Sequence, residues 1–238
     1  MVIPLKIDFK NIRENRQKIN NTNVYNSILF DNKNDFFKYI NQKELDRLLQ
    51  ELDTTFDDIW NKCLDDHLFA KLFSRNISIC ASRQGTNDEK EQLKTCNITT
   101  SKCGIFIENL TATATRLTKD GDIISKKDMK KYNITKDNCL KSFDGKITGK
   151  INGYISAKVA FGNGGHQDNV FEELDNMADC WSKYKKEDNN ILVFLIDTDL
   201  ENKFNCLKKK YENYDNIKFF DHYSFQEYII NNYDDDNI

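Results

Sequence analysis

An aspartate, a lysine and a pair of glutamates stand within about thirty residues of one another, at Asp144, Lys158 and Glu172–Glu173. Asp144 and Lys158 each lie in a short β-like run, so both are expected on strands. A carboxylate can bind Mg²⁺, and a lysine amine can orient a water molecule and stabilise the charge that develops on a phosphate. These side chains therefore predict Mg²⁺-dependent hydrolysis of a phosphodiester, with Asp144 as a metal ligand.

The residue two positions before the lysine is a serine, Ser156. In a strand this position shares a face with Lys158, but a serine cannot supply a second negative charge. The following helix can supply one, because Glu172 lies fourteen residues after Lys158. A polar loop that contains Gln167 precedes that helix.

This stretch resembles type II restriction endonucleases of the PD-(D/E)XK superfamily, in the branch whose second acid has moved to the following helix. That branch has serine, any residue and lysine, then a glutamate at this same distance, with a glutamine in the polar loop. The resemblance implies that Ser156 marks the vacated acid position and that Glu172 is the replacement acid. It also implies that Glu172 holds the metal ion together with Asp144.

The chain departs from that branch ahead of the lysine. Asp144 is only fourteen residues before Lys158, and Phe143 stands where a proline is usual. The short separation fits a plain hairpin. The choice of second acid stays open, because spacing favours Glu172, whereas Glu173 lies at the edge of the apolar face of the helix. Both acids would also suit the first turn of a helix for its dipole alone.

A second group of polar residues precedes these by some sixty positions, in the segment 82–89. In the superfamily a glutamate from an early helix often points into the site, and Glu89 fits that role as a fourth catalytic residue. Arg83 can hold a phosphate as a bidentate donor, and Gln84 beside it is a candidate DNA contact. The alternative is a helix cap with a surface pair.

The glycine-rich segment 162–169 is expected to be a loop between the catalytic strand and its helix. In the resembling enzymes this region reads bases in the major groove, where Asn and Gln pair with adenine and Asp accepts from cytosine. The alternative is a phosphate-cradling nucleotide-binding loop, but the lysine and Ser/Thr of a P-loop are lacking. The candidate DNA contacts here are Asn163, His166, Gln167, Asp168 and Asn169.

The elements around these residues predict an α/β fold. Strands are expected over 77–81, 104–117, 141–148, 154–161, 190–197 and 217–220, with helices over 200–214 and 224–231 and an irregular segment over 118–140. Residues 149–153 read as a hairpin turn, and 190–197 as a strand buried on both sides. Together they form a mixed central β-sheet flanked by helices. The resemblance implies that this is a restriction-endonuclease-like core, over residues 76–238. Residues 1–75 are expected to be a helical N-terminal region that dimerises or clamps DNA.

Composition narrows the class of protein. The net charge of −3 does not favour a general polyanion binder, and 39% apolar residues are enough for a core. The seven cysteines form no CxxC pair, which argues against structural zinc and for reduced thiols in the cytoplasm. The first residues do not resemble a signal peptide, and no apolar run approaches the length of a membrane span.

The resemblance as a whole implies a type II endonuclease that cleaves double-stranded DNA at a short, palindromic sequence with Mg²⁺. A two-fold symmetric site implies at least a homodimer. A companion DNA methyltransferase is expected in the same system. A repair-type or nicking nuclease of the same fold is the nearest alternative, and a catalytically inactive DNA-binding module is a second.

Overall fold

The computed structural model describes residues 2–111, 115–161, 165–183 and 189–234, with the backbone alone for residues 83 and 165–168. The chain divides into two compact units, one formed by Asp8–Gln84 and the other by Met1–Ile7 with Gly85–Ile238. The larger unit carries all the residues around Asp144 and Lys158.

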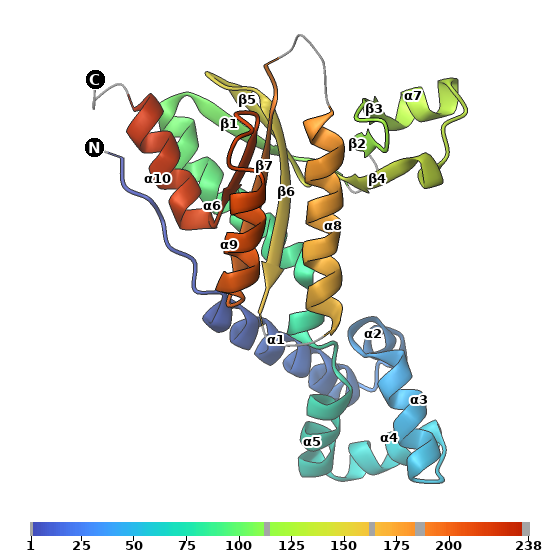
Figure 1. Cartoon of the computed structure of the whole chain (residues 1–238). Coiled ribbons are helices and arrows are strands. Elements are labelled where there is room, and N and C mark those ends of the chain that lie inside the picture. The colour runs from blue at the N-terminus through green and yellow to red at the C-terminus, as the bar shows by residue number, and fades with distance from the viewer. Residues whose placement is uncertain (1, 112–114, 162–164, 184–188, 235–238) are drawn as a thin grey trace. The chain divides into compact units, whose positions relative to one another are not determined.

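A five-stranded mixed sheet is the centre of the larger unit (Figure 1). Its order is β1–β5–β6–β7–β8, with β1 antiparallel to β5, β5 antiparallel to β6, and β6, β7 and β8 parallel. The strands are β1 (Ile105–Asn109), β5 (Gly145–Gly149), β6 (Gly153–Ala160), β7 (Ile191–Thr198) and β8 (Ile217–Phe220). The expected mixed α/β architecture with a flanked central sheet is confirmed.

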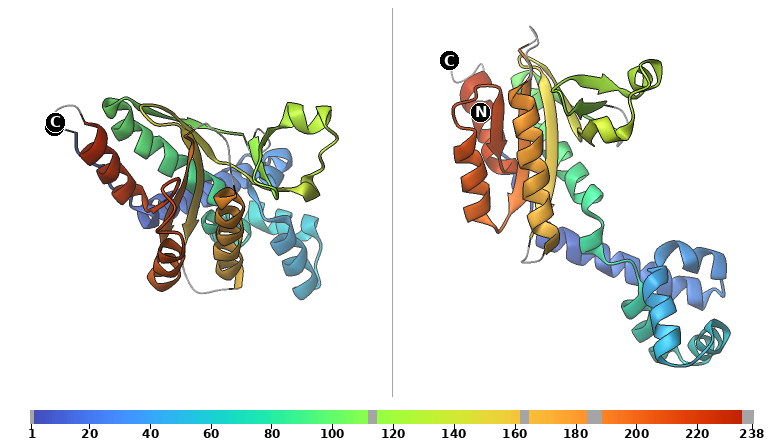
Figure 2. Two further views of the ribbon diagram at one scale, coloured as in Figure 1. Left: turned by 45° about the horizontal axis from the view of Figure 1, so that its top comes forward. Right: turned by 45° about the vertical axis from the view of Figure 1, so that its right-hand side comes forward.

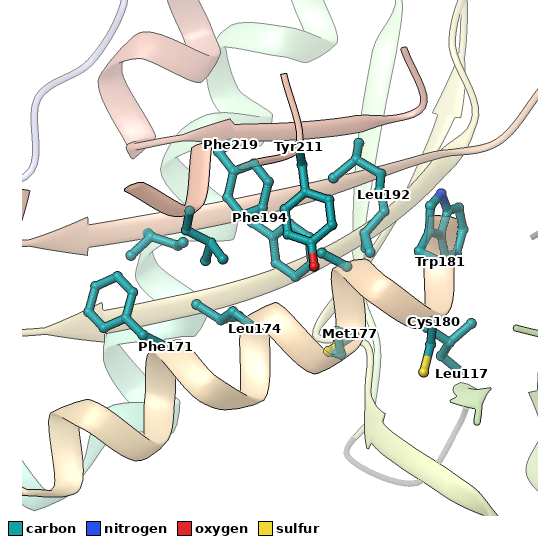
Figure 3. Close-up of a cluster of buried hydrophobic side chains, with 14 of the residues drawn as sticks. Leu117, Phe171, Leu174, Met177, Cys180, Trp181, Leu192, Phe194, Tyr211 and Phe219 are labelled. Atoms are coloured by element: carbon teal, nitrogen blue, oxygen red, sulfur yellow. The ribbon is translucent and has the colours of Figure 1, made fainter. Parts of the chain in front are cut away.

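Two helices cover each face of this sheet (Figure 2). On one face lie α6 (Gly85–Thr100) and α10 (His222–Tyr233), and on the other lie α8 (Gly165–Ser182) and α9 (Glu201–Lys210). Both faces of β7 are therefore buried, which explains its continuous apolar sequence. Figure 3 shows the core on the α8 side, where Phe171, Leu174 and Met177 of the helix share one buried cluster with Phe194 of β7.

A smaller antiparallel sheet is inserted between β1 and β5, in the order β3–β2–β4 (yellow-green in Figure 1). Its elements are β2 (Thr115–Thr118), β3 (Ile123–Ser125), α7 (Lys126–Lys131), the 3₁₀ turn η3 (Lys136–Asn138) and β4 (Cys139–Ser142). The single strand predicted over 104–117 is therefore wrong, because β1 and β2 belong to different sheets. The irregular segment predicted over 118–140 contains ordered elements.

The strand predicted over 141–148 is also two strands, β4 and β5, with Phe143 and Asp144 at their junction. Phe143 is fully buried and stacks on Tyr154, with Trp181 edge-on to its ring. Its N–H donates to the carbonyl of Thr115 in the small sheet (3.1 Å), whereas the N–H of Asp144 donates to Ile155 in the large one (2.8 Å). The chain changes sheet between these two residues.

The predicted hairpin turn joins β5 to β6. Gly149 has a φ of +113°, and a Cβ there would lie 2.2 Å from the carbonyl oxygen of Gly104. Only glycine fits this combination of conformation and contact. A short 3₁₀ turn, η2 (Ser101–Cys103), leads into β1 beside it.

The smaller unit is helical and has its own core. It contains α1 (Phe9–Leu29), α2 (Lys33–Tyr39), α3 (Gln42–Glu51), α4 (Phe56–Asp65), α5 (His67–Ile77) and the 3₁₀ turn η1 (Ala81–Arg83). Phe36 and Trp60 are buried at its centre. The strand predicted over 77–81 is wrong, because Ile77 ends α5 and Ser78 makes only an isolated bridge with Ile40. In the part of the chain that the structure describes, no helix has both the length and the apolar character of a membrane span.

Candidate active site

Asp144 lies at the start of β5 and is held by the strands on both sides of it. Its carbonyl accepts the N–H of Leu110 (2.9 Å), and its own N–H donates to Ile155 of β6 (2.8 Å). The side-chain oxygen Oδ2 accepts the main-chain N–H of Ala157 (2.9 Å). Three backbone contacts therefore set the direction of this carboxylate.

Lys158 brings a positive charge to the same carboxylate. It lies in β6, and its Nζ is 3.4 Å from Oδ2 of Asp144 and 3.4 Å from Oε1 of Glu89, while it also donates to the carbonyl of Ala157 (2.8 Å). The side chain is only 10% exposed. Burial alone lowers the pKa of this amine, but the carboxylates of Asp144 and Glu89 outweigh burial and raise that pKa. Lys158 is therefore a cation and a hydrogen-bond donor at neutral pH.

Glu89 reaches the site from the first turns of α6 on the other side of Lys158. Burial raises the pKa of its carboxyl, against the opposing effect of Lys158 and with a further increase from Asp144. The structure thus brings together three residues that lie 69 and 14 positions apart in the sequence. The site buries one amine between two carboxyl groups. Removing such charges from water is costly, and their mutual attraction offsets part of that cost.

The two glutamates of α8 differ in where their side chains lie. Glu172 is exposed, and no described residue is bonded to its side chain. Glu173 is 22% exposed, forms an ion pair with Lys141, and raises the pKa of Lys158 through its charge. Glu173 is thus the partly buried member of the pair and Glu172 the exposed one, and the choice of second acid stays a prediction.

Glu173 also has a buried oxygen that lacks a donor. No described residue donates a hydrogen bond to its Oε1. A buried carboxylate oxygen without a partner is costly, and a cation is one way to satisfy it. Mg²⁺ prefers carboxylate and other oxygen ligands, so Asp144 and Glu173 suit it chemically. Ser156 is 1% exposed on β6 and is uncharged, so it contributes no carboxylate to the site.

A hydrogen-bonded network adjoins Lys158, and no motif in the sequence predicted it. Gln92 of α6 donates both to the carbonyl of Lys158 (3.1 Å) and to Oδ2 of Asp197 (2.6 Å). Asp197 Oδ1 is 2.6 Å from Nδ1 of His222, whose Nε2 accepts the N–H of Ile7 (2.9 Å). That acceptor role assigns the imidazole proton to Nδ1.

Asp197, His222 and Asp221 also place three possible metal-ligating atoms within 4.8 Å of one another. However, Asp197 and His222 already bond to each other, and Asp221 caps α10 by accepting from the N–H groups of Tyr223 and Ser224 (both 2.8 Å). These three side chains already have hydrogen-bond partners within the fold, so we assign them a structural role.

Of the predicted DNA-contacting residues, the structure describes the side chains of Gln84 and Asn169 alone. Gln84 lies in the helical unit, where its side chain accepts from Asn20 (3.2 Å). Asn163 lies outside the described residues, as do the side chains of Arg83, His166, Gln167 and Asp168. The loop predicted through Asn169 is wrong, because α8 begins at Gly165 and Asn169 is exposed on that helix. The first N–H groups of a helix have no intrahelical partner and need another acceptor, so polar residues suit a first turn.

Comparison of the chain with family models, with curated proteins and with solved structures finds no match.

Proposed function

We propose that this protein is a Mg²⁺-dependent endonuclease that hydrolyses phosphodiester bonds of double-stranded DNA. The observation that carries the proposal is the buried amine of Lys158, held 3.4 Å from both Asp144 and Glu89. A buried cation between one acid beside a strand and another on a helix is costly to assemble, and such clusters are typical of functional sites.

The order of elements supports the same proposal. Helix α6 is followed by the antiparallel strands β1, β5 and β6, then by α8 and by β7 parallel to β6. We take this as a restriction-endonuclease-like core, with Asp144 on its second strand, Lys158 on its third and Glu89 on its first helix. The small β3–β2–β4 sheet is an insertion between the first and second strands of that core.

Each residue then has a defined role. Asp144 and Glu173 would hold Mg²⁺, with Glu172 as the alternative that spacing suggests. The ion would polarise the phosphate and lower the pKa of a bound water. Lys158 remains protonated, so it orients the water and stabilises negative charge on the phosphate by donating hydrogen bonds. Ala157 keeps Asp144 oriented through its main-chain N–H, and Glu89 holds the Lys158 amine from the opposite side.

The finer assignment rests on the resemblance of residues 144–173. By that resemblance the protein is a type II restriction endonuclease that cuts a short palindromic sequence as a homodimer, and a DNA methyltransferase protects the same site. The helical unit would serve dimerisation or clamping of DNA. A repair-type or nicking nuclease would use the same side chains, so the pattern of products separates these alternatives.

The test is incubation of the purified protein with phage λ DNA, in Mg²⁺ or in EDTA. The variant is Lys158→Ala, and the matched control is Lys146→Ala, which removes an exposed lysine from the neighbouring strand β5. Circular dichroism and thermal melting first establish that both variants are folded.

We expect discrete fragments with Mg²⁺, for the wild type and Lys146→Ala but not for Lys158→Ala. A smear or nicked circles would replace the site-specific assignment by a non-specific or nicking nuclease. Intact DNA from folded wild-type protein, across several metals and salt concentrations, would overturn the nuclease proposal.

A further inference from the structure

The inserted β3–β2–β4 sheet carries a cationic groove beside α7. The groove has a volume of about 600 Å³, and four of the residues that line it are basic: Arg116, Lys126, Lys130 and Lys136. None of the described residues that line it is acidic. This is a local surplus in a chain whose 35 basic and 38 acidic residues nearly balance.

The charges of the insertion are segregated between two grooves. A second groove of about 530 Å³ is lined by Asp120, Asp122 and Asp128, and no described lysine or arginine lines it. Asp128 is held there by Ser125, whose hydroxyl donates to its carboxylate (2.6 Å) and accepts its N–H (3.1 Å). The one acid within α7 therefore lines the acidic groove and not the cationic one.

The lysines of the cationic groove lack the carboxylate partners that some other surface lysines of this chain have among the described residues. Lys183 and Lys210 are bound to carboxylates at 2.8 and 2.6 Å. Lys126, Lys130 and Lys136 are exposed, and none forms an ion pair with a described residue. Their charges are thus available to a polyanion.

The groove is attached to the strand that leads into the candidate active site. Arg116 pairs with Ser142 of β4, and its guanidinium donates to the carbonyl of Leu140 (3.0 Å). Ser142 is two residues before Asp144, so at most about 7 Å of chain separates their Cα atoms. Leu117 of the same small sheet is fully buried against α8. The groove is therefore carried by a packed element close to Asp144.

We propose that this cationic groove binds the phosphate backbone of DNA beside the bond that the Asp144–Lys158 site cleaves. The inference rests on the proposed nuclease function. In it, the inserted sheet positions the DNA duplex. Duplex DNA carries a phosphate about every 3.4 Å along each strand, so several phosphates lie within reach of a groove this close to Asp144. Such contacts set register and orientation and carry no base specificity.

The test compares two triple variants that lose the same charge. Lys126→Gln/Lys130→Gln/Lys136→Gln removes the groove lysines, and Lys102→Gln/Lys208→Gln/Lys209→Gln removes three exposed lysines elsewhere on the larger unit. Binding of a fluorescent 30-base-pair duplex is measured by anisotropy in EDTA at several KCl concentrations. Lys130→Gln alone is the second variant, should the triple variant fold poorly.

We expect the groove variant to weaken binding at least tenfold at 100 mM KCl, and the control to stay within twofold of the wild type. Three lost phosphate contacts would also reduce the slope of log K against log [KCl] by about 2 to 3. In cleavage with Mg²⁺, the groove variant is expected to raise KM and leave kcat at saturating DNA unchanged.

The outcomes separate the two proposals. Equal affinity and equal slope for both triple variants would overturn the groove proposal, whether or not the wild type cleaves DNA. Binding that depends on the groove, from a wild type that never cleaves, would support the groove and overturn the nuclease. A wild type that neither binds nor cleaves DNA would overturn both.

Discussion

The main-chain N–H of Ala157 donates to Asp144 Oδ2 at 2.9 Å, and the Lys158 amine lies 3.4 Å from the same oxygen. One strand therefore both orients the aspartate and places a cation against it. Both contacts fall on the same carboxylate oxygen, Oδ2.

Substitution of Asp144 by asparagine keeps the shape of the side chain and its acceptor for Ala157 but removes the charge. Because a metal ion contributes several kcal/mol of charge stabilisation, cleavage is expected to fall by about 10²-fold or more. DNA binding in EDTA should be retained. Single-turnover cleavage and anisotropy measure the two effects, and cleavage within threefold of the wild type would remove Asp144 from the proposed metal site.

Substitution of each α8 glutamate by glutamine decides which one is the second acid. Glu173→Gln is expected to lower Mg²⁺-dependent cleavage by about 10²-fold, because it removes a charge from the metal site. Glu172→Gln, at an exposed position of the same helix, should stay within a few-fold of the wild type. Titration of cleavage rate against Mg²⁺ concentration measures both. A larger loss of cleavage in Glu172→Gln than in Glu173→Gln would identify Glu172 as the second acid, as its spacing from Lys158 predicts.

Asp175 predicts a pH-dependent contribution to stability away from the site. Its carboxylate accepts from Lys210 (2.6 Å) and from the hydroxyl of Tyr211 (2.7 Å). Burial alone raises its pKa, but these two hydrogen bonds outweigh burial and lower the pKa below 3.8. A lowered folded-state pKa means that the ionised group stabilises the fold above pH 3.8, and that this contribution is lost as the pH falls through the folded-state pKa.

Asp175→Asn is therefore expected to lose about 1 kcal/mol or less at pH 7, because the side chain is more than one third exposed. The difference from the wild type should shrink as the pH falls below 3.8. Urea unfolding at pH 7 and near pH 3 measures it, with Glu212→Gln as a control for an exposed carboxylate. A difference that grows at low pH would contradict the assignment.

Gln226 ties the first residues of the chain to α10. It accepts the N–H of Leu5 (2.8 Å), donates to the carbonyl of Leu5 (2.9 Å), and accepts from the hydroxyl of Thr99 (2.6 Å). The side chain is fully buried. Gln226→Leu leaves these groups without partners, so a loss of about 1–3 kcal/mol in the free energy of unfolding is expected.

Urea unfolding measures this loss, and amide exchange at Leu5 should become faster. Glu227→Gln, on the exposed face of the same helix, is the matched control. Unchanged protection of the Leu5 amide in Gln226→Leu would show that the tether is made by other contacts.

The close pairing of β6 with β7 leaves no room for a side chain at Gly153. A Cβ at this position would lie 2.1 Å from the carbonyl oxygen of Ile191, whereas a Cβ at Gly85 would meet nothing within 4 Å. Gly153→Ala is therefore expected to destabilise the fold by about 1–3 kcal/mol through overpacking. Gly85→Ala should change stability by less than about 1 kcal/mol. Thermal melting of the two variants compares them, and equal melting temperatures would contradict this packing argument.

Much of the central sheet was predictable because its signals are local. The strand over 217–220 matches β8, and the apolar run over 190–197 differs from β7 by one residue at each end. The hairpin between β5 and β6 followed from the glycines at 149 and 153. Asp144 and Lys158 were singled out from residue type and spacing, and the hydrogen bonds of their two strands bring them together.

The boundaries of the small sheet were not predictable from local pattern. The run over 141–148 alternates as one strand would, but burial of Phe143 under Trp181 places the chain in one sheet before that residue and in another after it. Likewise, the segment over 77–81 is apolar enough for a strand, yet it has only Ile40 as a bridge partner. A strand exists only where a neighbour completes its hydrogen bonds.

The sequence by itself therefore determined the order of the main strands and helices and made Asp144 and Lys158 candidate residues, because these depend on residue type and short spacing. Glu89 became a candidate through the resemblance to the superfamily. Only the tertiary structure decided that Glu173 is partly buried and pairs with Lys141 while Glu172 is exposed, and that four basic residues of the insertion line one groove. Those relations depend on how helix α8 and the small sheet pack against the core, and packing joins residues that are far apart in the chain.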